Sequence, residues 1–337
     1  MNKYLFLGIT LLLISCQKKQ ENPILTHIKV QKIIQTIKIP KNSFLHQKIK
    51  EPEPGDWTFG HKEEGQPFHD YIQINPVRGH RERNKIYLLP LGHFDPTEQK
   101  LLNSCAKYLK VYFGMEVIVQ KETDIAQIPN SARRYRQENG LTWEQILTKY
   151  VMYEMLLPKI PQDAIAYMAV SKYDLYPEDS WNFVFGQAST RQKVGVSSFQ
   201  RYITPDWQKD EKQFQLVLMR LMKTTTHEIG HMLSILHCIY YECNMNGSNS
   251  LEESDRKPAY LCPICVSKLS WNLNYDLRER YKNLAAYFEK NDFEVEQQFC
   301  IKSIAFLDSL QAQCSQPWTP ALEYELFIQV HDQAIRK

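Results

Sequence analysis

The sequence contains no block of five or more basic residues, and its charges are nearly balanced: 41 Lys and Arg stand against 38 Asp and Glu, a formal net charge of +3. This balance gives no indication of binding to nucleic acid or to an anionic membrane surface. Glycine (12 residues) and proline (17 residues) are too scarce for a collagen-like or low-complexity chain, and no repeat of solenoid length is apparent. With 337 residues, 43% of them hydrophobic, the chain is predicted to be globular.

Long hydrophobic runs are also missing. The uncharged run near the N-terminus, residues 4–15, is shorter than the about 20 residues that span a bilayer as a helix. Because Lys3 precedes it and Cys16 follows it, residues 1–15 are predicted to be a signal peptide. Residues 13–16, Leu-Ile-Ser-Cys, resemble the lipobox of bacterial lipoproteins, which implies cleavage before Cys16, its lipidation, export and anchoring to the bacterial cell envelope. The alternative is an ordinary secretory signal with an incidental cysteine.

Composition divides the rest of the chain into an arm and a folded part. Residues 16–65 are rich in Lys, Gln, Glu and Pro and are predicted to form a tether and an extended arm with little regular structure. Residues 66–337 are predicted to form the folded domain, with an upper part to about residue 236 and a lower part over residues 237–337. Apolar residues at helical spacing predict a helical C-terminal layer in the lower part: Leu277, Tyr281, Leu284, Phe288, Phe299, Ile304 and Leu307.

Strand and helix patterns alternate in the upper part. Asp95 and Pro96 provide an N-cap and a proline at the first helical position, and Thr142 and Gln145 have the spacing of a capping box. Strands interleaved with helices predict an α/β fold with a mostly parallel sheet and one antiparallel edge strand. The expected strands are residues 86–89, 115–120, 164–170, 182–188 and 194–199, and the expected helices are residues 95–109, 142–156 and a long one that begins near Asp206.

The long helix runs into an H-E-x-x-H motif, His227-Glu228-Ile229-Gly230-His231, followed by His237. His227 and His231 are one turn apart, about 40° around the helix axis, so both imidazoles can bind one metal ion. Six further residues place His237 roughly 240° from His231, so the helix must end and the chain must turn back for His237 to join them. Three neutral imidazoles leave a zinc ion one open position for water, which indicates a catalytic site with Glu228 beside that water.

Four cysteines follow the histidines directly. Cys238 and Cys243 form one pair, and Cys262 and Cys265 form a C-x-x-C pair. Four thiolates can enclose a tetrahedral zinc ion that has no room for substrate, so such a site would be structural. In an exported protein the competing interpretation is two disulfides. The interleaving with a zinc-binding histidine motif favours zinc.

From His227 to Cys265 the chain resembles the archaemetzincin signature HExxHxxGxxHCxxxxCxM followed by CxxC. Weaker similarity extends over roughly residues 55–290. The resemblance implies an α/β metzincin-like fold, with a twisted five-stranded sheet that is mostly parallel, one antiparallel edge strand, a backing helix, an active-site helix and a mainly helical C-terminal subdomain. Residues 66–337 would then be the catalytic domain of a zinc metallopeptidase.

The resemblance also implies a role for each motif residue. His227, His231 and His237 would bind the catalytic Zn²⁺, Glu228 would be the general base, and Met245 would be the Met-turn residue beneath the metal. The cysteines would bind a second, structural Zn²⁺, through Cys238, Cys243, Cys262 and Cys265. A peptide or protein substrate would pair with the edge strand expected at residues 182–188.

One residue departs from the family pattern, because Ser234 replaces the glycine three residues after His231. A serine at positive φ costs about 1 kcal/mol. This departure motivates an alternative function, a catalytically silent, zinc-stabilised peptide-binding lipoprotein; a zinc-handling lipoprotein is a third. We expect a monomer with no nucleic-acid partner. Cys105, Cys300 and Cys314 lie outside both motifs, and we interpret them chiefly as buried thiols.

Overall fold

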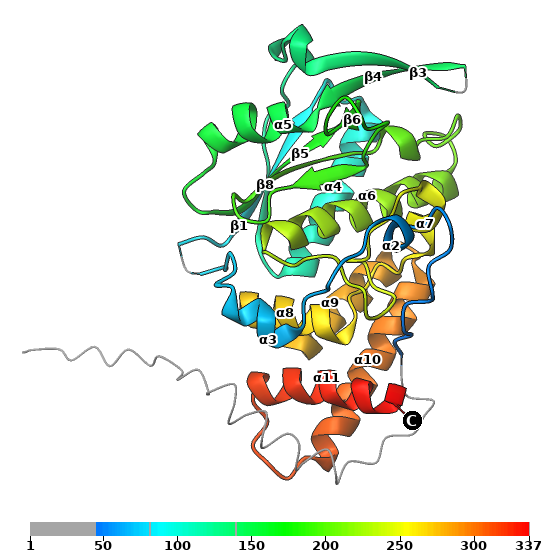
Figure 1. The fold of residues 1–337 in the computed structure, drawn as a ribbon. Coiled ribbons are helices and arrows are strands. Elements are labelled where there is room, and N and C mark those ends of the chain that lie inside the picture. Colours follow the sequence, from blue (N-terminus) through cyan, green and yellow to red (C-terminus); the bar gives the residue numbers. More distant parts are fainter. Residues whose placement is uncertain (1–44, 81, 139, 337) are drawn as a thin grey trace, which may run out of the picture.

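The computed structural model describes residues 45–336 except Arg81 and Asn139, with side chains described up to His331. The expected signal peptide and the lipobox cysteine Cys16 lie outside the described residues. A sheet with its covering helices forms one half of the molecule, and a group of helices forms the other half (Figure 1). Among the described residues, no helix combines the length and the apolar character that crossing a bilayer requires.

The central sheet has five strands in the order β2-β1-β5-β8-β7. Neighbouring strands are parallel except for β7, which pairs antiparallel with β8 at one edge. This arrangement confirms the predicted sheet. The central strand β5 is fully buried along its length, because Ala, Ile, Val and Met on both faces meet packed layers. The strands are β1 (Lys85–Leu91), β2 (Glu116–Val119), β5 (Ala164–Ser171), β7 (Gly186–Ala188) and β8 (Val194–Ser198).

Two long helices, α4 (Pro96–Phe113) and α6 (Glu211–Met232), cover one face of the sheet. The predicted start of α4 is confirmed: the Asp95 side chain accepts hydrogen bonds from Thr97 and Glu98, and Glu98 bonds back to the Asp95 backbone. The apolar stripe of α6 is buried against α4 and the sheet, through Phe214, Val217, Leu218, Leu221 and Met222. This packing fixes the helix that carries the H-E-x-x-H motif.

The opposite face of the sheet carries a second core and a hairpin where a helix was expected. Residues 142–156 were expected to be one helix, but β4 (Leu141–Leu147) pairs with β3 (Arg133–Glu138) in a three-stranded sheet that includes β6 (Asp174–Tyr176). Helical structure begins only at Thr148. Asn139-Gly140 is a strong hairpin signal, and Gly140 adopts the positive φ of 75° that a tight turn requires.

Short helical segments follow this hairpin and connect the other elements. They are α5 (Thr148–Tyr150), a π-helical turn (Val151–Leu156) and 3₁₀ turns at Ile125–Gln127, Asn130–Ala132, Leu157–Lys159 and Gln200–Tyr202.

The lower half is helical, as predicted for the C-terminal layer (Figure 1). Apolar residues of its helices join the same core as α4 and α6, so the two halves share one hydrophobic interior. The helices are α7 (Leu251–Arg256), α8 (Pro263–Leu273), α9 (Leu277–Lys290), α10 (Glu294–Gln313) and α11 (Pro320–Arg336), preceded in sequence by α2 (Trp57–Gly60) and α3 (Phe68–Gln73).

Candidate active site and a thiolate cluster

Helix α6, which carries the H-E-x-x-H motif, ends where the sequence requires it to end. Met232 is its last residue, and Ser234 has φ +66°, the left-handed conformation for which glycine is usual. Schellman-type bonds close the helix, with Ile235 N donating to Gly230 O at 3.1 Å. The predicted reversal of the chain therefore occurs with serine in the glycine position.

The hydroxyl of Ser234 makes two hydrogen bonds that a glycine lacks. Ser234 Oγ donates to Thr190 O at 2.8 Å, in the connection between β7 and β8, and it accepts from Val77 N at 3.1 Å. The turn that leads from α6 to His237 is thus tied both to the sheet edge and to the segment that follows α3. These two bonds offset the strain of the left-handed backbone.

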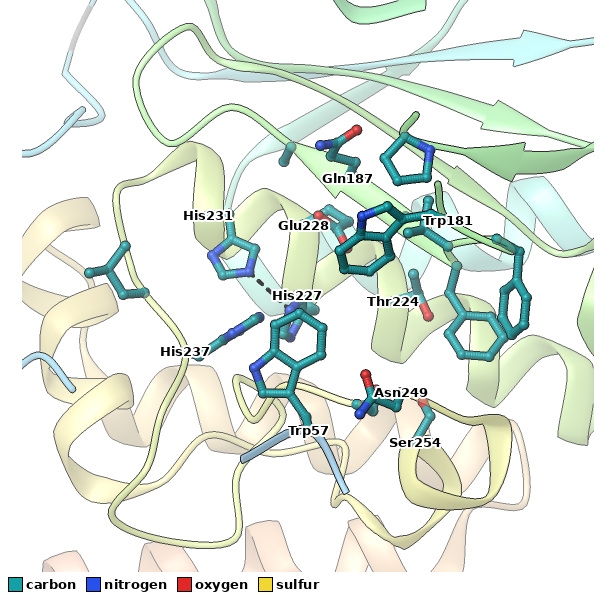
Figure 2. A pocket seen from close by; sticks show the side chains of 18 of the residues that line it. Trp57, Trp181, Gln187, Thr224, His227, Glu228, His231, His237, Asn249 and Ser254 are labelled. Carbon is teal, nitrogen blue, oxygen red and sulfur yellow. Dashed lines mark hydrogen bonds between the residues drawn. The ribbon is translucent and has the colours of Figure 1, made fainter. Parts of the chain in front are cut away.

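Three imidazoles converge in the cleft, as Figure 2 shows for His227, His231 and His237. One nitrogen from each ring lies within 4.8 Å of the others, and the Nε2 atoms of His227 and His231 are 3.0 Å apart. Two nitrogens that bind one tetrahedral zinc ion at about 2.0–2.1 Å are separated by about 3.3 Å. The donor set and its spacing therefore fit a zinc ion with one position left open.

The outward nitrogens of the same rings all have hydrogen-bond acceptors. His227 Nδ1 lies 2.8 Å from Asn244 O, and His231 Nδ1 lies 2.7 Å from Ile235 O. His237 Nδ1 lies 2.7 Å from Glu63 Oε1. An acceptor at Nδ1 fixes the proton there and leaves the Nε2 lone pair for a metal ion.

Glu228 lies beside this cluster, under the edge strand β7 (Figure 2). Its side chain occupies the space where Gly186 has no Cβ: a methyl group there would lie 2.8 Å from Glu228 Cγ and Oε1. Burial raises the pKa of the Glu228 carboxyl to about 8, and the ammonium of Lys257 opposes the shift. The carboxyl is therefore held in a dry position that faces the cleft.

Met245 packs beneath the histidines. A Cβ on Gly230 would lie 2.7 Å from Met245 Sδ, so the absence of a side chain at Gly230 admits the thioether against α6. Met245 O accepts from Cys238 N at 2.8 Å. Met245 thus joins the floor of the histidine cluster to the first cysteine, and it has no group that can take part in proton transfer.

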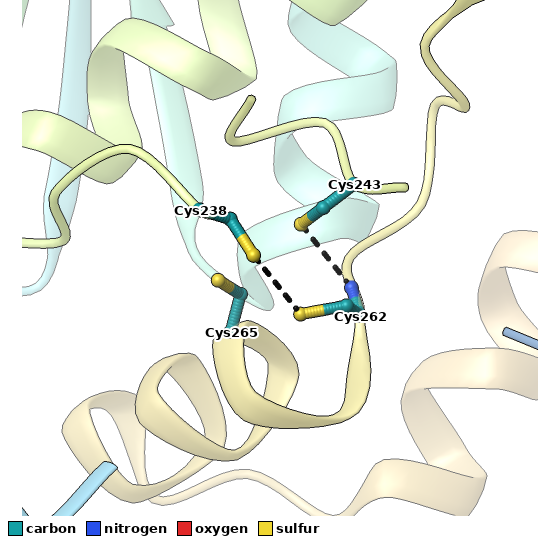
Figure 3. A group of neighbouring side chains, drawn as sticks. All are labelled: Cys238, Cys243, Cys262 and Cys265. Carbon is teal, nitrogen blue, oxygen red and sulfur yellow. Dashed lines mark hydrogen bonds between the residues drawn. The ribbon is translucent and has the colours of Figure 1, made fainter. Parts of the chain in front are cut away.

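The four cysteines of the second motif also come together, with their sulfur atoms facing one another (Figure 3). All four thiols are buried and unbridged, and their Sγ atoms lie within 4.8 Å of one another. Cys238 Sγ and Cys262 Sγ are 3.6 Å apart, close to the about 3.8 Å between two sulfurs on one tetrahedral zinc ion. Backbone N–H groups of Met245 and Cys262 donate to Cys243 Sγ. The cluster fits a closed thiolate metal site.

The histidines, Glu228 and the edge strand line one cleft with a volume of about 1050 Å³. The expected edge strand, residues 182–188, is shorter than predicted: only Gly186–Ala188 pairs with β8, and the preceding residues line the cleft as a loop. Trp181 in that loop and Trp57 flank the cleft (Figure 2). The cleft is therefore bordered by the sheet edge and by the N-terminal arm.

The contacts of the N-terminal arm with the site were not predicted from the sequence. Trp57 N donates to Glu253 Oε1 at 2.8 Å, and Asp56 pairs with Arg256 at 2.5 Å, so the arm is fixed to α7. Trp57 Nε1 then donates to Glu63 at 3.2 Å, beside the bond to His237. No metal-ligand spacing connects Glu63 to the motif, so the sequence held no signal for it.

Cys105, Cys300 and Cys314, the other cysteines among the described residues, do not extend either cluster. Cys105 and Cys300 are buried and Cys314 is partly exposed, and all three are free thiols. Cys105 Sγ lies 3.3 Å from Thr225 Oγ1 on α6. The prediction of buried thiols is therefore confirmed for Cys105 and Cys300 and is wrong for Cys314.

Comparisons with known proteins agree with the motif. Residues 156–271 match the model for Peptidase family M54. Human archaemetzincin-2 is 33% identical over 266 residues, which cover 70% of this chain and 72% of that protein, and rat archaemetzincin-2 is 32% identical over 280 residues, which cover 74% and 76%. The crystal structure of an archaemetzincin from Archaeoglobus fulgidus is 32% identical and covers 55% of this chain and 99% of its own, with a TM-score of 0.42. The chain belongs to the archaemetzincin family and is a zinc metallopeptidase.

Proposed function

We propose that this peptidase holds two zinc ions, one between His227, His231 and His237 and one between the four cysteines, and that Glu228 is its general base. The observation that carries the proposal is the convergence of one ring nitrogen from each of the three histidines, whose Nδ1 atoms each have an acceptor. The thiolate cluster has no open side in the buried interior, which supports a structural role for the second ion.

A zinc ion bound by the imidazoles supplies Lewis-acid chemistry, since it acidifies water near neutral pH and polarises a peptide carbonyl. Glu228 is placed to accept the proton of the attacking water and to deliver it to the departing amine. The products are a carboxylate and an amine. Burial of Glu228 under β7 excludes bulk water from this proton transfer, and Gly186 keeps the strand close to the carboxyl.

We propose that substrate binds in an extended form along β7. This strand pairs with β8 on one side only, and residues Phe185–Ala188 line the cleft beside the histidines and Glu228. Backbone hydrogen bonds to such an edge accept many sequences, because they do not involve the substrate side chains. A peptide there would run past the metal position.

The test is to compare Glu228→Ala and Glu228→Gln with the wild type on a peptide library, with zinc measured in each protein. The proposal predicts two zinc ions in all three proteins and a loss of hydrolysis of at least about a hundredfold in both variants. Identical product patterns in wild type and variants would instead support the silent peptide-binding alternative. Ser234, which motivated that alternative, does not prevent His237 from joining the other histidines.

For residues 1–16 we propose lipidation of Cys16 and membrane anchoring in a bacterial envelope, on the basis of the sequence pattern alone. Expression in a bacterium fed with an alkyne-labelled fatty acid should label the wild type and Cys314→Ser, but not Cys16→Ser. The wild type should also partition into detergent. Equal labelling of wild type and Cys16→Ser would exclude this anchor.

A further inference from the structure

The buried Lys223 and the half-buried Lys257 line the cleft at the end nearest α7. Lys223 lies one helical turn before His227 on α6, about 6 Å along the helix axis, and Lys257 follows α7. Figure 2 shows the neighbouring cleft residues Thr224, Asn249 and Ser254 on the side of His227 away from His231 and His237. We call this region the lysine end of the cleft; it comprises Lys223, Thr224, Ser248, Asn249, Ser254 and Lys257.

Both ammonium groups bond to neutral acceptors only. Lys223 Nζ donates to Ser254 O at 2.6 Å, and Lys257 Nζ donates to Asn246 O at 2.9 Å and to Ser248 Oγ at 3.2 Å. Within the part of the chain that the structure describes, no carboxylate oxygen forms an ion pair with either lysine.

Four carboxylates act on these lysines, and Glu228 and Glu296 do so without a direct contact, whereas Asp255 and Glu253 have other partners. Asp255 forms a bidentate pair with Arg220, at 3.0 and 2.6 Å. Glu253 accepts from the backbone N–H groups of Trp57 at 2.8 Å and Asn249 at 2.6 Å. The lysine end therefore holds two cations whose charge is not neutralised by a direct contact.

Removal of such cations from water is unfavourable, and this desolvation lowers the pKa of both lysine side chains. Desolvation lowers the pKa of Lys223 to about 8, and it lowers that of Lys257 to about 8 with a contribution from repulsion by Lys223. Both lysines line the same cleft, and the charge of Lys223 contributes to the lowered pKa of Lys257. An anion between them would offset both the desolvation and the repulsion.

We propose that the lysine end of the cleft binds a carboxylate of the peptide substrate, held by Lys223 and Lys257 while the scissile bond lies at the histidines. This inference rests on the proposed function and names its substrate class: peptides with a carboxylate close to the cleaved bond. That carboxylate belongs either to an Asp or Glu side chain or to the C-terminus. Charge-assisted hydrogen bonds of this kind discriminate strongly against the uncharged amide.

The test uses quenched fluorescent peptides in matched sets. One set carries Glu or Gln at each position in turn with an amidated C-terminus, and the other has neutral side chains with a free or an amidated C-terminus. For wild type, one of the two sets should show kcat/KM higher for the carboxylate than for its amide by about tenfold to a hundredfold. The set that shows the preference identifies the source of the carboxylate.

The variants Lys223→Met and Lys257→Met should reduce that preference to about twofold or less, mainly through KM, and the Arg variants should restore part of it. Lys149→Met is the matched control, because Lys149 is an exposed lysine at the cleft that pairs with Glu178 at 3.2 Å; it should keep the wild-type preference. Zinc content and thermal unfolding, measured on every variant, identify any that fails to fold.

Equal kcat/KM for carboxylate and amide peptides in the folded wild type would overturn the proposal. An unchanged preference in the folded methionine variants would also overturn the proposal. The role of both lysines would then be structural, through their hydrogen bonds to residues 246–255. Neither result depends on the catalytic assignment, which is tested separately by loss of hydrolysis of neutral peptides in Glu228→Ala.

Discussion

Glu63 Oε1 lies 2.7 Å from Nδ1 of His237, although the two residues are 174 positions apart in the sequence. The contact gives the third histidine of the cluster the carboxylate partner that commonly orients imidazole ligands. It also makes the N-terminal arm part of the active site. The His237 ring is the one of the three that a loop carries, so its orientation depends most on this bond.

Glu63→Ala is expected to weaken zinc binding at the histidine site by about tenfold to a hundredfold, because His237 loses its fixed tautomer and orientation. Competition with a chromophoric chelator measures the affinity. Glu63→Gln should lie between Ala and wild type, because the amide oxygen still accepts from Nδ1. Glu64→Gln is the control, since Glu64 is exposed at the same cleft; if it weakened zinc binding as much, a general charge effect would explain the result.

Gly186→Ala is expected to lower kcat at least about tenfold with two zinc ions retained, because the new methyl group would displace the Glu228 carboxyl. The test is to measure the rate of peptide hydrolysis and the zinc content of the same protein samples. Gly60→Ala is the matched control, since a Cβ there meets no atom within 4 Å. Wild-type turnover in Gly186→Ala would show that the position of Glu228 tolerates the displacement.

Cys262→Ser is expected to lose at least half of the zinc and to unfold at a lower temperature, because a tetrahedral thiolate site loses one ligand within the shared core. Cys314→Ser, at a partly exposed thiol, should retain both ions. Elemental analysis together with calorimetry measures both effects. Two zinc ions in Cys262→Ser with unchanged stability would contradict the structural site.

Ser234→Ala should destabilise the fold by about 1–3 kcal/mol, because it removes two hydrogen bonds and keeps the strained backbone. Ser234→Gly should be less destabilising, since relief of about 1 kcal/mol of left-handed strain offsets part of the lost hydrogen bonding. Urea unfolding of zinc-loaded proteins gives both values. A glycine variant less stable than the alanine variant would contradict this account.

Stability should fall with acid because of two buried histidines, His46 and His331, that are not part of the metal motifs. The ring of His46 lies against that of His331 at 5.0 Å, and His331 Nδ1 bonds to Phe327 O. Burial lowers the pKa of His331 to about 4, and burial together with the His331 charge lowers that of His46 well below 6.5.

Both folded-state pKa values lie below the unfolded value, so the unfolded chain binds more protons below pH 6.5. The free energy of unfolding should therefore keep its maximum value with respect to these histidines above pH 6.5. Between pH 6.5 and 4 it should fall by about 1.4 kcal/mol per pH unit for each histidine. Urea unfolding at pH 7.5, 6.0 and 5.0 tests this, with His331→Leu as comparison. The metal ligands titrate in both proteins, so the difference in slope isolates His331; equal slopes would exclude it.

The sequence predicted those features whose cause lies within a few neighbouring residues. Asp95 and Pro96 capped α4 as expected, and the side chains of both motifs come together in the fold, as their spacing predicted. The prediction of a helix over residues 142–156 was wrong because it followed a capping-box pattern and not the hairpin signal of Asn139-Gly140. In the structure, residues 141–146 pair with β3, and residues 141–147 form β4. Local propensity could not decide between these two structures.

The contacts between segments distant in the sequence, which shape the site, could not be predicted. Glu63 reaches His237 only because Asp56 and Trp57 fasten the arm to α7, and neither contact has a spacing that a pattern can reveal. The lysine end depends similarly on how residues 246–257 fold over α6. Such contacts come from tertiary packing of polar side chains, which periodicity does not encode.

His237 and Cys238 are adjacent in the chain, so one peptide unit joins the two proposed metal centres. An ion leaving the thiolate centre would release Cys238 and loosen the backbone that presents the third imidazole. The reverse is not true, because the thiolates are enclosed by core side chains whether or not the imidazoles hold an ion. Demetallation should consequently be sequential, with the hydrolytic ion exchanging reversibly first, and reconstitution of a fully stripped protein should require the sulfur-bound ion before activity returns.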